Sequence, residues 1–233
     1  QWNLPMMNVP EAWKNKLYGQ YWDKDQKGNV TVAVVDSGVY GSGGTQVDNP
    51  HEDINYDHIL KGTNLMDSQE GTPDTLGHGT FITGLIAARQ NNGKGVAGIM
   101  PDVDILPIRI FGSTGRTSTS TVVEGIYRAI DADVDVINLS LGSEGSSTEM
   151  KTACETAVEK GILVVAAAGN DGTRVNNYPA AYDCVIGVAS LDEDGQLSYF
   201  SQYGDSVYVA APGGKVTSVL NEASKYVTGS GTS

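Results

Sequence analysis

The segment NVTVAVVDSGV, residues 29–39, decides the class of fold. Its apolar residues are mainly β-branched and run almost without interruption, which is typical of a strand buried on both faces of a parallel sheet. The segment then passes into Asp36, Ser37 and Gly38, so a polar turn follows at the carboxyl end of the strand. In open parallel sheets this end of the strands is where sites are built.

Five further segments have a buried-strand pattern: DILPIRIF (104–111), VDVINLSLG (134–142), GILVVAAAGN (161–170), CVIGVASL (184–191) and SVYVAAPG (206–213). Helical patterns lie at TLGHGTFITGLIAARQNN (75–92), STVVEGIYRAIDA (120–132) and STEMKTACETAVEKG (147–161). Alternating strands and helices predict an α/β fold, a three-layer sandwich whose mainly parallel central sheet is flanked by helices.

Length and charge restrict the classes of protein that fit. The 233 residues suit a single domain, and the formal net charge of −13 argues against a nucleic-acid or anionic-membrane surface, which needs clustered Lys and Arg. The carboxylates either form an acidic, soluble surface or include ligands for calcium. No stretch approaches the roughly 20 apolar residues of a membrane span, and the first residues lack a signal-peptide pattern, so we expect a mature or trimmed segment.

The chain has two cysteines, Cys154 and Cys184. One disulfide and two buried thiols are both compatible with this number. No histidine lies near either cysteine in the sequence, so we do not expect a cysteine nucleophile.

Three polar residues stand at the ends of predicted elements. Asp36 closes the first strand, Asn170 closes the strand within 161–170, and His78 opens a helix after a glycine. Each signal is weak alone, because Asp commonly caps a turn and a lone His is commonly structural. On a parallel sheet, however, the three residues are expected at the same edge.

Five motifs resemble, in order and spacing, those of the subtilisin-like serine proteases: VAVVDSGV (32–39), HGTFITG (78–84), INLSLG (137–142), VVAAAGN (164–170) and GSGTS (229–233). The resemblance runs over essentially the whole chain, and the pattern is similar above all to that of subtilisin and thermitase. It implies a serine endopeptidase that hydrolyses extended polypeptides through an acyl-enzyme, with Asp36, His78 and Ser233 as the catalytic triad.

The resemblance also assigns the chemical roles. His78 takes the proton of the Ser233 hydroxyl and later gives a proton to the leaving amine, because a neutral hydroxyl is a poor nucleophile. Asp36 fixes the tautomer of His78 and stabilises its protonated form. Asn170 and the backbone N–H of Ser233 donate to the negatively charged oxygen of the tetrahedral intermediate, forming the oxyanion hole.

The substrate is expected to insert as an extended strand between two segments. The implied strand-pairing residues are Gly115, Arg116 and Thr117 on one side and Ser140, Leu141 and Gly142 on the other. Residues 140–142 also line the implied primary pocket, together with Ala167, Ala168 and Gly169 and the segment before YPA (178–180). Main-chain pairing implies sequence-tolerant cleavage. Asp171 either favours a basic substrate side chain or is a solvated loop carboxylate.

The segment ARQNNGKGVAG (88–98) resembles the calcium loop of the family, more in the thermitase form. The implied metal ligands are the Asp53 carboxylate, the carbonyls of Arg89, Lys94 and Val96, and the Asn92 side chain, an all-oxygen set that suits structural calcium. The family's N-terminal ligand falls upstream of Gln1, so either the calcium site is incomplete in this chain or Gln1 or Asn3 replaces that ligand. A glycine-rich turn without metal is the alternative.

Two features depart from the family pattern. The insertion YGSGGTQVDNP (40–50) either shapes the substrate cleft or is a longer surface loop. The family's serine begins a buried helix, whereas nothing follows Ser233, so residues 1–233 are expected to be a catalytic domain truncated at the serine.

Exposed apolar surface would result from that missing helix, so a separate C-terminal segment is one expected partner. A propeptide inhibitor and polypeptide substrates are the others; nucleic acid and a membrane span are not expected. The family's usual setting implies a secreted or cell-surface protein, with a cytoplasmic one as the alternative. A non-catalytic peptide-binding homologue or an inactive fragment is the alternative function.

Overall fold

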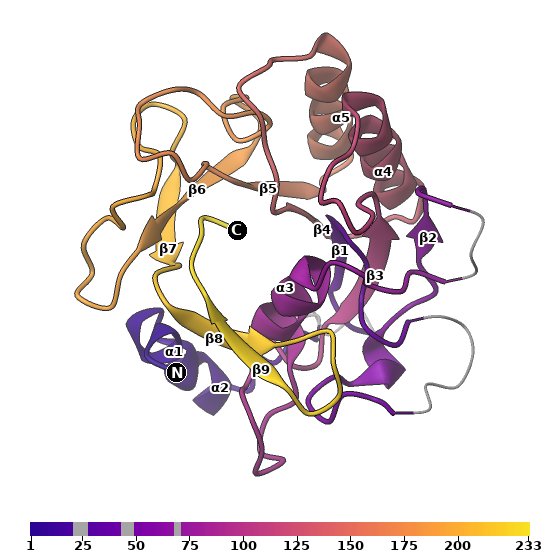
Figure 1. Cartoon of the computed structure of the whole chain (residues 1–233), viewed down its shortest axis with the longest axis vertical. Coiled ribbons are helices and arrows are strands. Elements are labelled where there is room, and N and C mark those ends of the chain that lie inside the picture. Colours follow the sequence, from indigo (N-terminus) through magenta and orange to yellow (C-terminus); the bar gives the residue numbers. More distant parts are fainter. Residues whose placement is uncertain (21–27, 43–48, 68–70) are drawn as a thin grey trace.

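A parallel β-sheet lies at the centre of the residues that the computed structural model describes, 1–20, 28–42, 49–67 and 71–233 (Figure 1). Its seven described strands follow the order β2-β3-β1-β4-β5-β6-β7, and each neighbouring pair is parallel. The strands are β1 (Thr31–Asp36), β2 (Thr63–Asn64), β3 (Asp104–Arg109), β4 (Val136–Leu139), β5 (Leu163–Ala167), β6 (Ile186–Leu191) and β7 (Val209–Pro212).

Helices cover both faces of this sheet. Helices α4 (Thr119–Asp131) and α5 (Thr148–Glu159) pack on one face, and α3 (His78–Ala87) packs on the other (Figure 1). The alternating side chains of β1 show the division: Ala33 and Val35 belong to the core cluster with α4 and α5, whereas Val32 and Val34 belong to the cluster with α3. The predicted three-layer α/β fold is therefore confirmed.

The helix ends follow from local sequence. Ser118 and Ser147 accept a hydrogen bond from the backbone N–H three residues later and so cap α4 and α5. Gly161 follows α5 with a φ of 85°, a conformation that glycine adopts without steric cost. Among the described residues, no helix is long and apolar enough to cross a bilayer.

Several elements were not predicted from the sequence. They are α1 (Asn3–Met6), α2 (Val9–Lys14), the short 3₁₀ helix η1 (Tyr56–His58), strand β2, and the antiparallel hairpin of β8 (Val216–Val219) and β9 (Tyr226–Gly229). The hairpin packs on α3, where a Cβ atom at Gly84 would collide with Ser218 and Val219. This close approach requires glycine at this position of α3, and the hairpin leads the chain to Ser233.

The predicted helix over 75–92 is too long. α3 begins at His78 and ends at Ala87, and a loop follows it. In the predicted insertion over 40–50, residues 43–48 lie outside the described residues.

Both cysteines are free thiols. Cys154 is fully buried on α5, and Cys184 is half-buried against the same core cluster. Burial raises the pKa of the Cys154 thiol to about 12, with a smaller contribution from the nearby Cys184. Burial also raises the pKa of Cys184. Both shifts disfavour the thiolate, which is the nucleophilic form of cysteine.

Candidate active site

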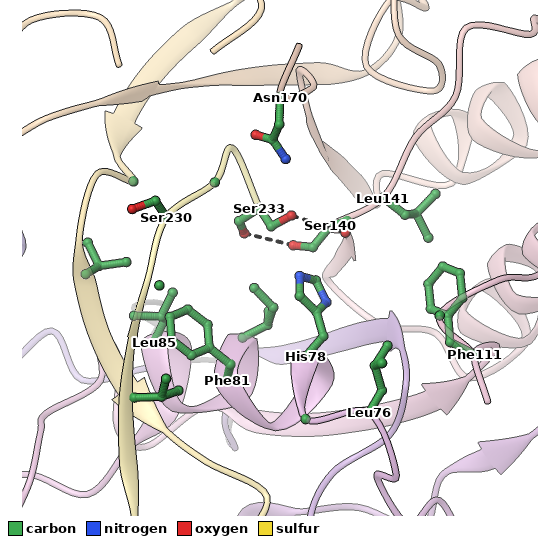
Figure 2. Close-up of a pocket in the computed structure, with 18 of the residues that line it drawn as sticks. Leu76, His78, Phe81, Leu85, Phe111, Ser140, Leu141, Asn170, Ser230 and Ser233 are labelled. Atoms are coloured by element: carbon green, nitrogen blue, oxygen red, sulfur yellow. Dashed lines mark hydrogen bonds between the residues drawn. The ribbon is translucent and has the colours of Figure 1, made fainter. Parts of the chain in front are cut away.

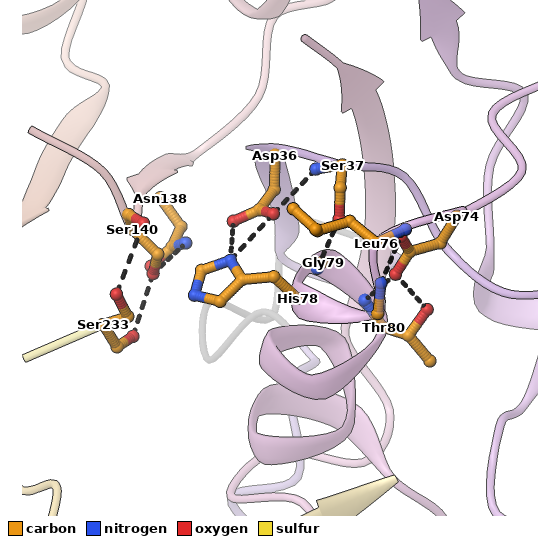
Figure 3. Close-up of polar contacts among 11 residues, drawn as sticks. Asp36, Ser37, Asp74, Leu76, His78, Gly79, Thr80, Asn138, Ser140 and Ser233 are labelled. Atoms are coloured by element: carbon orange, nitrogen blue, oxygen red, sulfur yellow. Dashed lines mark hydrogen bonds and ion pairs between the residues drawn. The ribbon is translucent and has the colours of Figure 1, made fainter. Parts of the chain in front are cut away.

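Asp36, which is buried, and His78, which is partly exposed, form a hydrogen-bonded pair at the carboxyl end of β1. The Nδ1 atom of His78 lies 2.9 and 2.8 Å from the two carboxylate oxygens of Asp36, which is inaccessible to solvent (Figure 3). The second ring nitrogen of His78 faces the side on which Ser140 and Ser233 lie (Figure 3). Because Asp36 accepts at Nδ1, the neutral ring carries its proton there and leaves the other nitrogen free to act as a base.

The surroundings of His78 raise the pKa of its imidazole. Burial by itself lowers the pKa, but the hydrogen bond and the negative charge of Asp36, together with the charge of Asp74, outweigh it. The protonated ring is therefore stabilised, as a group that must accept a proton during a reaction requires.

Ser233 lies next to Ser140, which directly follows β4. The Ser233 hydroxyl donates to the carbonyl oxygen of Ser140 at 3.3 Å, and the Ser140 hydroxyl donates to the carbonyl oxygen of Ser233 at 2.9 Å (Figure 3). In this geometry the Ser233 hydroxyl is directed to Ser140 and not to His78. Rotation about its side-chain torsion, a rapid motion for an exposed residue, is needed to turn it to the imidazole.

Asn170 and Thr232 interact directly. The Oδ1 atom of Asn170 accepts hydrogen bonds from the backbone N–H and the hydroxyl of Thr232, at 2.8 and 3.0 Å. The Thr232 hydroxyl in turn accepts from the N–H of Gly169 at 3.0 Å. With its oxygen so held, the amide of Asn170 presents its nitrogen toward Ser233 (Figure 2). Thr232 belongs to the GSGTS motif, but its contact with Asn170 was not predicted from the sequence.

A cavity of about 720 Å³ joins these groups. Of the predicted site residues, His78, Asn170, Ser233, Gly115, Ser140, Leu141 and Gly142 line it. Apolar side chains complete the walls, and Figure 2 shows Leu76 and Phe111 on one side of His78 and Phe81 and Leu85 on the other. The cavity therefore combines a few polar groups with apolar walls, as ligand sites usually do.

The other predicted substrate-binding residues differ from one another in solvent exposure. Arg116 is exposed, and Thr117 is half-buried in the irregular segment after β3. Ala167 lines a second cavity on the sheet face, and Gly169 contacts Thr232. Ala168 is fully buried and donates its N–H to Val188, so its side chain belongs to the core.

Asn177 belongs to the segment before YPA (178–180) that was expected to complete the primary pocket, although no role was assigned to the residue itself. Its side chain is 8% exposed, donates to the carbonyl of Ala167 at 3.3 Å, and occupies the space that a Cβ atom at Gly142 would need. It thus brings the segment before YPA into contact with both Gly142 and Ala167, which belong to the other segments implied for substrate binding. Its neighbour Tyr178 pairs with Ser143 through two backbone hydrogen bonds, which brings the segment to this position.

Residues 27–233 match the Subtilase family. The chain belongs to the subtilase family. Over its full length it is 37% identical to minor extracellular protease Epr of Bacillus subtilis strain 168, and it spans 33% of the length of that protein. It is 37% identical to thermitase of Thermoactinomyces vulgaris, with 92% of the chain and 73% of thermitase covered.

The fold of this subtilase is similar to the crystal structure of a cold-adapted subtilisin-like serine proteinase. The two superpose with a TM-score of 0.75 at 28% sequence identity, over 92% of this chain and 76% of the other. The recognition of the family from its five motifs is therefore confirmed.

Two of the predicted calcium ligands of the subtilase, Asn92 and Val96, contact the carboxylate of a third, Asp53. Asp53 is fully buried; its Oδ1 atom accepts from the side-chain nitrogen of Asn92 at 2.6 Å, and its Oδ2 atom from the N–H of Val96 at 2.8 Å. The N–H of Arg89 donates to the carbonyl of Asp53 at 2.8 Å. The Lys94 ammonium pairs with Glu52 at 2.6 Å.

These residues supply the hard oxygen donors that calcium prefers. Among the described residues, no group of three or more His, Cys, Asp or Glu side chains could hold a metal ion, so a cation here depends on amide and carbonyl oxygens beside Asp53. The Asn92 amide now turns its nitrogen to Asp53, and turning its oxygen there would provide a ligand. With that rotation, Asp53 and Asn92 would present two adjacent oxygen donors of the kind that calcium prefers.

The N-terminus also reaches this loop. The side-chain amide of Gln1 accepts from the N–H of Ala97 at 2.7 Å and donates to its carbonyl at 3.0 Å. Asn3 instead lines the sheet-face cavity, and its Oδ1 atom has no hydrogen-bond partner. Of the two predicted substitutes for the N-terminal ligand, Gln1 is therefore the one at the loop.

Proposed function

We propose that this subtilase is a serine endopeptidase that uses Asp36, His78 and Ser233 as its triad. One observation carries the proposal: the Asp36–His78 pair and Ser233, which come from three distant parts of the chain, open onto the same cavity. The family relationship supports it, because the relatives at 37% identity are named as proteases.

The chemistry begins with rotation of the Ser233 hydroxyl from Ser140 to the free ring nitrogen of His78. His78 accepts the proton while the oxygen attacks the peptide carbonyl, and Asp36 stabilises the positive imidazolium. The same proton then passes to the leaving amine, which leaves an acyl-enzyme. Water then attacks the acyl-enzyme, with His78 again taking and returning a proton, and this hydrolysis releases the carboxylic-acid product and restores Ser233.

The developing negative charge on the carbonyl oxygen is stabilised by the Asn170 amide nitrogen and the backbone N–H of Ser233. The contact of Asn170 with Thr232 supports this role, because it holds the amide so that the donor faces the reaction. A donor that is already oriented needs no reorganisation during the reaction, which is why such groups lower the barrier strongly.

An extended polypeptide is the substrate class that fits the cavity. The segments after β3 and β4, represented by Gly115 and Leu141, lie on its rim and offer backbone groups on both sides of a peptide. The neighbouring apolar walls favour apolar substrate side chains, and the exposed Asp171 carries no selectivity in this proposal.

Covalent labelling tests the function. A fluorophosphonate is expected to label the full-length parent protein at Ser233, and Ser233→Ala is expected to abolish the labelling. Ser230→Ala, which removes a neighbouring cavity-lining hydroxyl, is the matched control and is expected to keep it. A folded parent that is not labelled would instead support the second candidate, a peptide-binding homologue without catalysis, and peptide affinity without cleavage would then be measured.

We also propose that the loop of residues 89–97 binds a structural calcium ion through Asp53, Asn92 and the carbonyls of Arg89, Lys94 and Val96, with Gln1 closing the loop. The burial of the Asp53 carboxylate supports this assignment, because a buried charge is stabilised by a cation. The ion would fix the loop and the N-terminus together and takes no part in proton transfer.

A second cavity, of about 340 Å³, supports a further proposal about partners. Apolar side chains of α3 and of strands β5, β6 and β7 line it, and it reaches Ser233. We propose that residues outside this chain fill it as an apolar helix, supplied by the longer protein or by a separate segment. A propeptide inhibitor is the other proposed partner, and it would occupy the substrate cavity.

The relative Epr is named as an extracellular protease, and we therefore propose that this subtilase is also secreted. Detection of the native protein in culture medium against the cell fraction tests it.

A further inference from the structure

Asp74 is a buried carboxylate that neither the predicted triad nor the predicted calcium site uses. It is 7% exposed and lies four residues before His78. It takes part in four hydrogen bonds as an acceptor, two at each oxygen, and all four donors belong to the segment that carries His78. Asp74 therefore binds both the turn before His78 and the first turn of the helix that carries it.

The start of α3 lacks an ordinary cap. The N-cap residue of α3 is Gly77, which has no side chain to accept from the free N–H groups of the first helical turn. Glycine is required there because its φ is 96°. The residue before His78 therefore cannot both adopt this turn and cap the helix.

Asp74 and Ser37 provide the missing cap. The Oδ2 atom of Asp74 accepts from the N–H and the hydroxyl of Thr80, at 2.9 and 2.6 Å. The Ser37 hydroxyl accepts from the N–H of Gly79 at 2.8 Å (Figure 3). The first turn of α3 is thus held from two sides, one of them the end of β1.

The other oxygen of Asp74 holds the turn that leads into His78. Its Oδ1 atom accepts from the N–H groups of Leu76 and Gly77, at 2.9 and 2.7 Å (Figure 3). The carboxylate therefore ties residues on both sides of His78 to one point. A rotation or shift of this turn would move the imidazole relative to Asp36.

We propose that Asp74 is a positioning residue of the triad, which holds the turn from Leu76 to Thr80 so that the His78 ring stays on Asp36. The proposal rests on the proposed function of His78 as the general base. Asp74 also acts through its charge, since it and Asp36 are the two carboxylates that raise the pKa of His78. A residue that only capped α3 would affect stability alone.

Asp74→Asn in the full-length parent is the principal test. The amide keeps one accepting oxygen but places N–H groups against two of the four donors, whichever way it turns, and it removes the charge. We expect kcat to fall about tenfold or more with little change in KM, because misplacement of a catalytic group slows the chemical step. We also expect the His78 ring to titrate at lower pH when it is followed by NMR.

Asp205→Asn is the matched control, because Asp205 is an exposed carboxylate that forms a surface ion pair with Arg174. It is expected to change neither the kinetics nor the titration. A folded Asp74→Asn protein with an unchanged kcat and an unchanged His78 titration would overturn the proposal, and so would a loss of activity that the unfolded fraction accounts for.

A second pair of variants decides the question if Asp74→Asn does not fold. Thr80→Val removes the hydroxyl bond to Asp74 and the bond that this hydroxyl accepts from the N–H of Tyr40, whereas Thr80→Ser retains both. We expect Thr80→Val to lower kcat at unchanged KM and Thr80→Ser to restore it; equal kcat values in the two variants would overturn the proposal. The NMR titration needs no turnover, so it tests Asp74 even if Ser233 fails to react with a fluorophosphonate.

Discussion

Thr232 holds the oxygen of the Asn170 side chain with two hydrogen bonds, one from its backbone N–H and one from its hydroxyl. Two donors on the oxygen define which end of the amide is the nitrogen, and this nitrogen faces Ser233 (Figure 2). The residue before the proposed nucleophile therefore orients the proposed oxyanion donor. This relationship couples the GSGTS segment to the end of β5.

Replacement of Asn170 tests that donor. Asn170→Ala is expected to lower kcat by about 10²–10³, which is the loss known for the corresponding amide in subtilisin, a member of the same family. Thr232→Val, which lacks the hydroxyl, is expected to lower kcat about tenfold with KM unchanged, since the backbone bond remains. Thr232→Ser is the control and should retain activity. Steady-state kinetics that show a change in KM alone would contradict this role.

The pH dependence of activity follows from the environment of His78. Burial lowers the pKa of the ring, but the bond to Asp36 and the charges of Asp36 and Asp74 raise it above the ordinary value of 6.5. A general base must be unprotonated, so kcat/KM is expected to rise with pH and to reach half its plateau above pH 6.5.

Asp36→Asn removes the main stabilising partner of the protonated ring. The midpoint of kcat/KM is then expected to move to lower pH, and the plateau to fall by about 10⁴, as when the aspartate of another serine protease triad is replaced. An acid limb centred below pH 6.5 in the unmodified protein would show that burial outweighs the carboxylates.

The side chain of Asn177 is expected to limit the size of the primary pocket. Asn177→Gly removes the amide that occupies the space above Gly142. We expect kcat/KM for substrates with a large aromatic residue before the cleaved bond to rise about tenfold relative to substrates with alanine there. The lost hydrogen bond to Ala167 costs about 1 kcal/mol of stability. An unchanged preference across a peptide series would place Asn177 outside the pocket.

Calcium removal is expected to destabilise the protein. At a calcium concentration 100 times the dissociation constant, binding adds about 2.7 kcal/mol to the free energy of unfolding. For a domain of this size, a chelator should then lower the melting temperature by about 5–10 °C.

Asp53→Asn is the matched variant for this measurement, because it replaces the buried carboxylate at the centre of the loop. Its melting temperature is expected to be lower and no longer sensitive to the chelator. If chelation leaves the melting curve of the unmodified protein unchanged, the loop is a metal-free turn that the Asp53–Asn92 and Lys94–Glu52 contacts hold.

Much of the fold was predictable because its signals are local. The β-branched run ending at Asp36 and the alternation of strand and helix patterns predicted a parallel sheet with layers on both faces, and the structure has this arrangement. The hairpin β8–β9 was missed because its strands are four residues long and gain their stability by packing on α3. The length of α3 was overestimated because the chain becomes extended at Ala88, with a ψ of 143°, and the N–H of Arg89 donates to the distant Asp53 instead of to a helical carbonyl.

The sequence by itself determined the class of fold, the family, and which residue types stand at the ends of the strands, since strand patterns and motif order can be read along the chain. The roles assigned to Asp36, His78, Ser233 and Asn170 stay predictions until the labelling and kinetic experiments are done. Tertiary structure alone decided how Asp74, Thr232 and Asn177 act. Each of these side chains works through backbone groups or side chains that other turns and strands bring to it, and local sequence does not encode such partners.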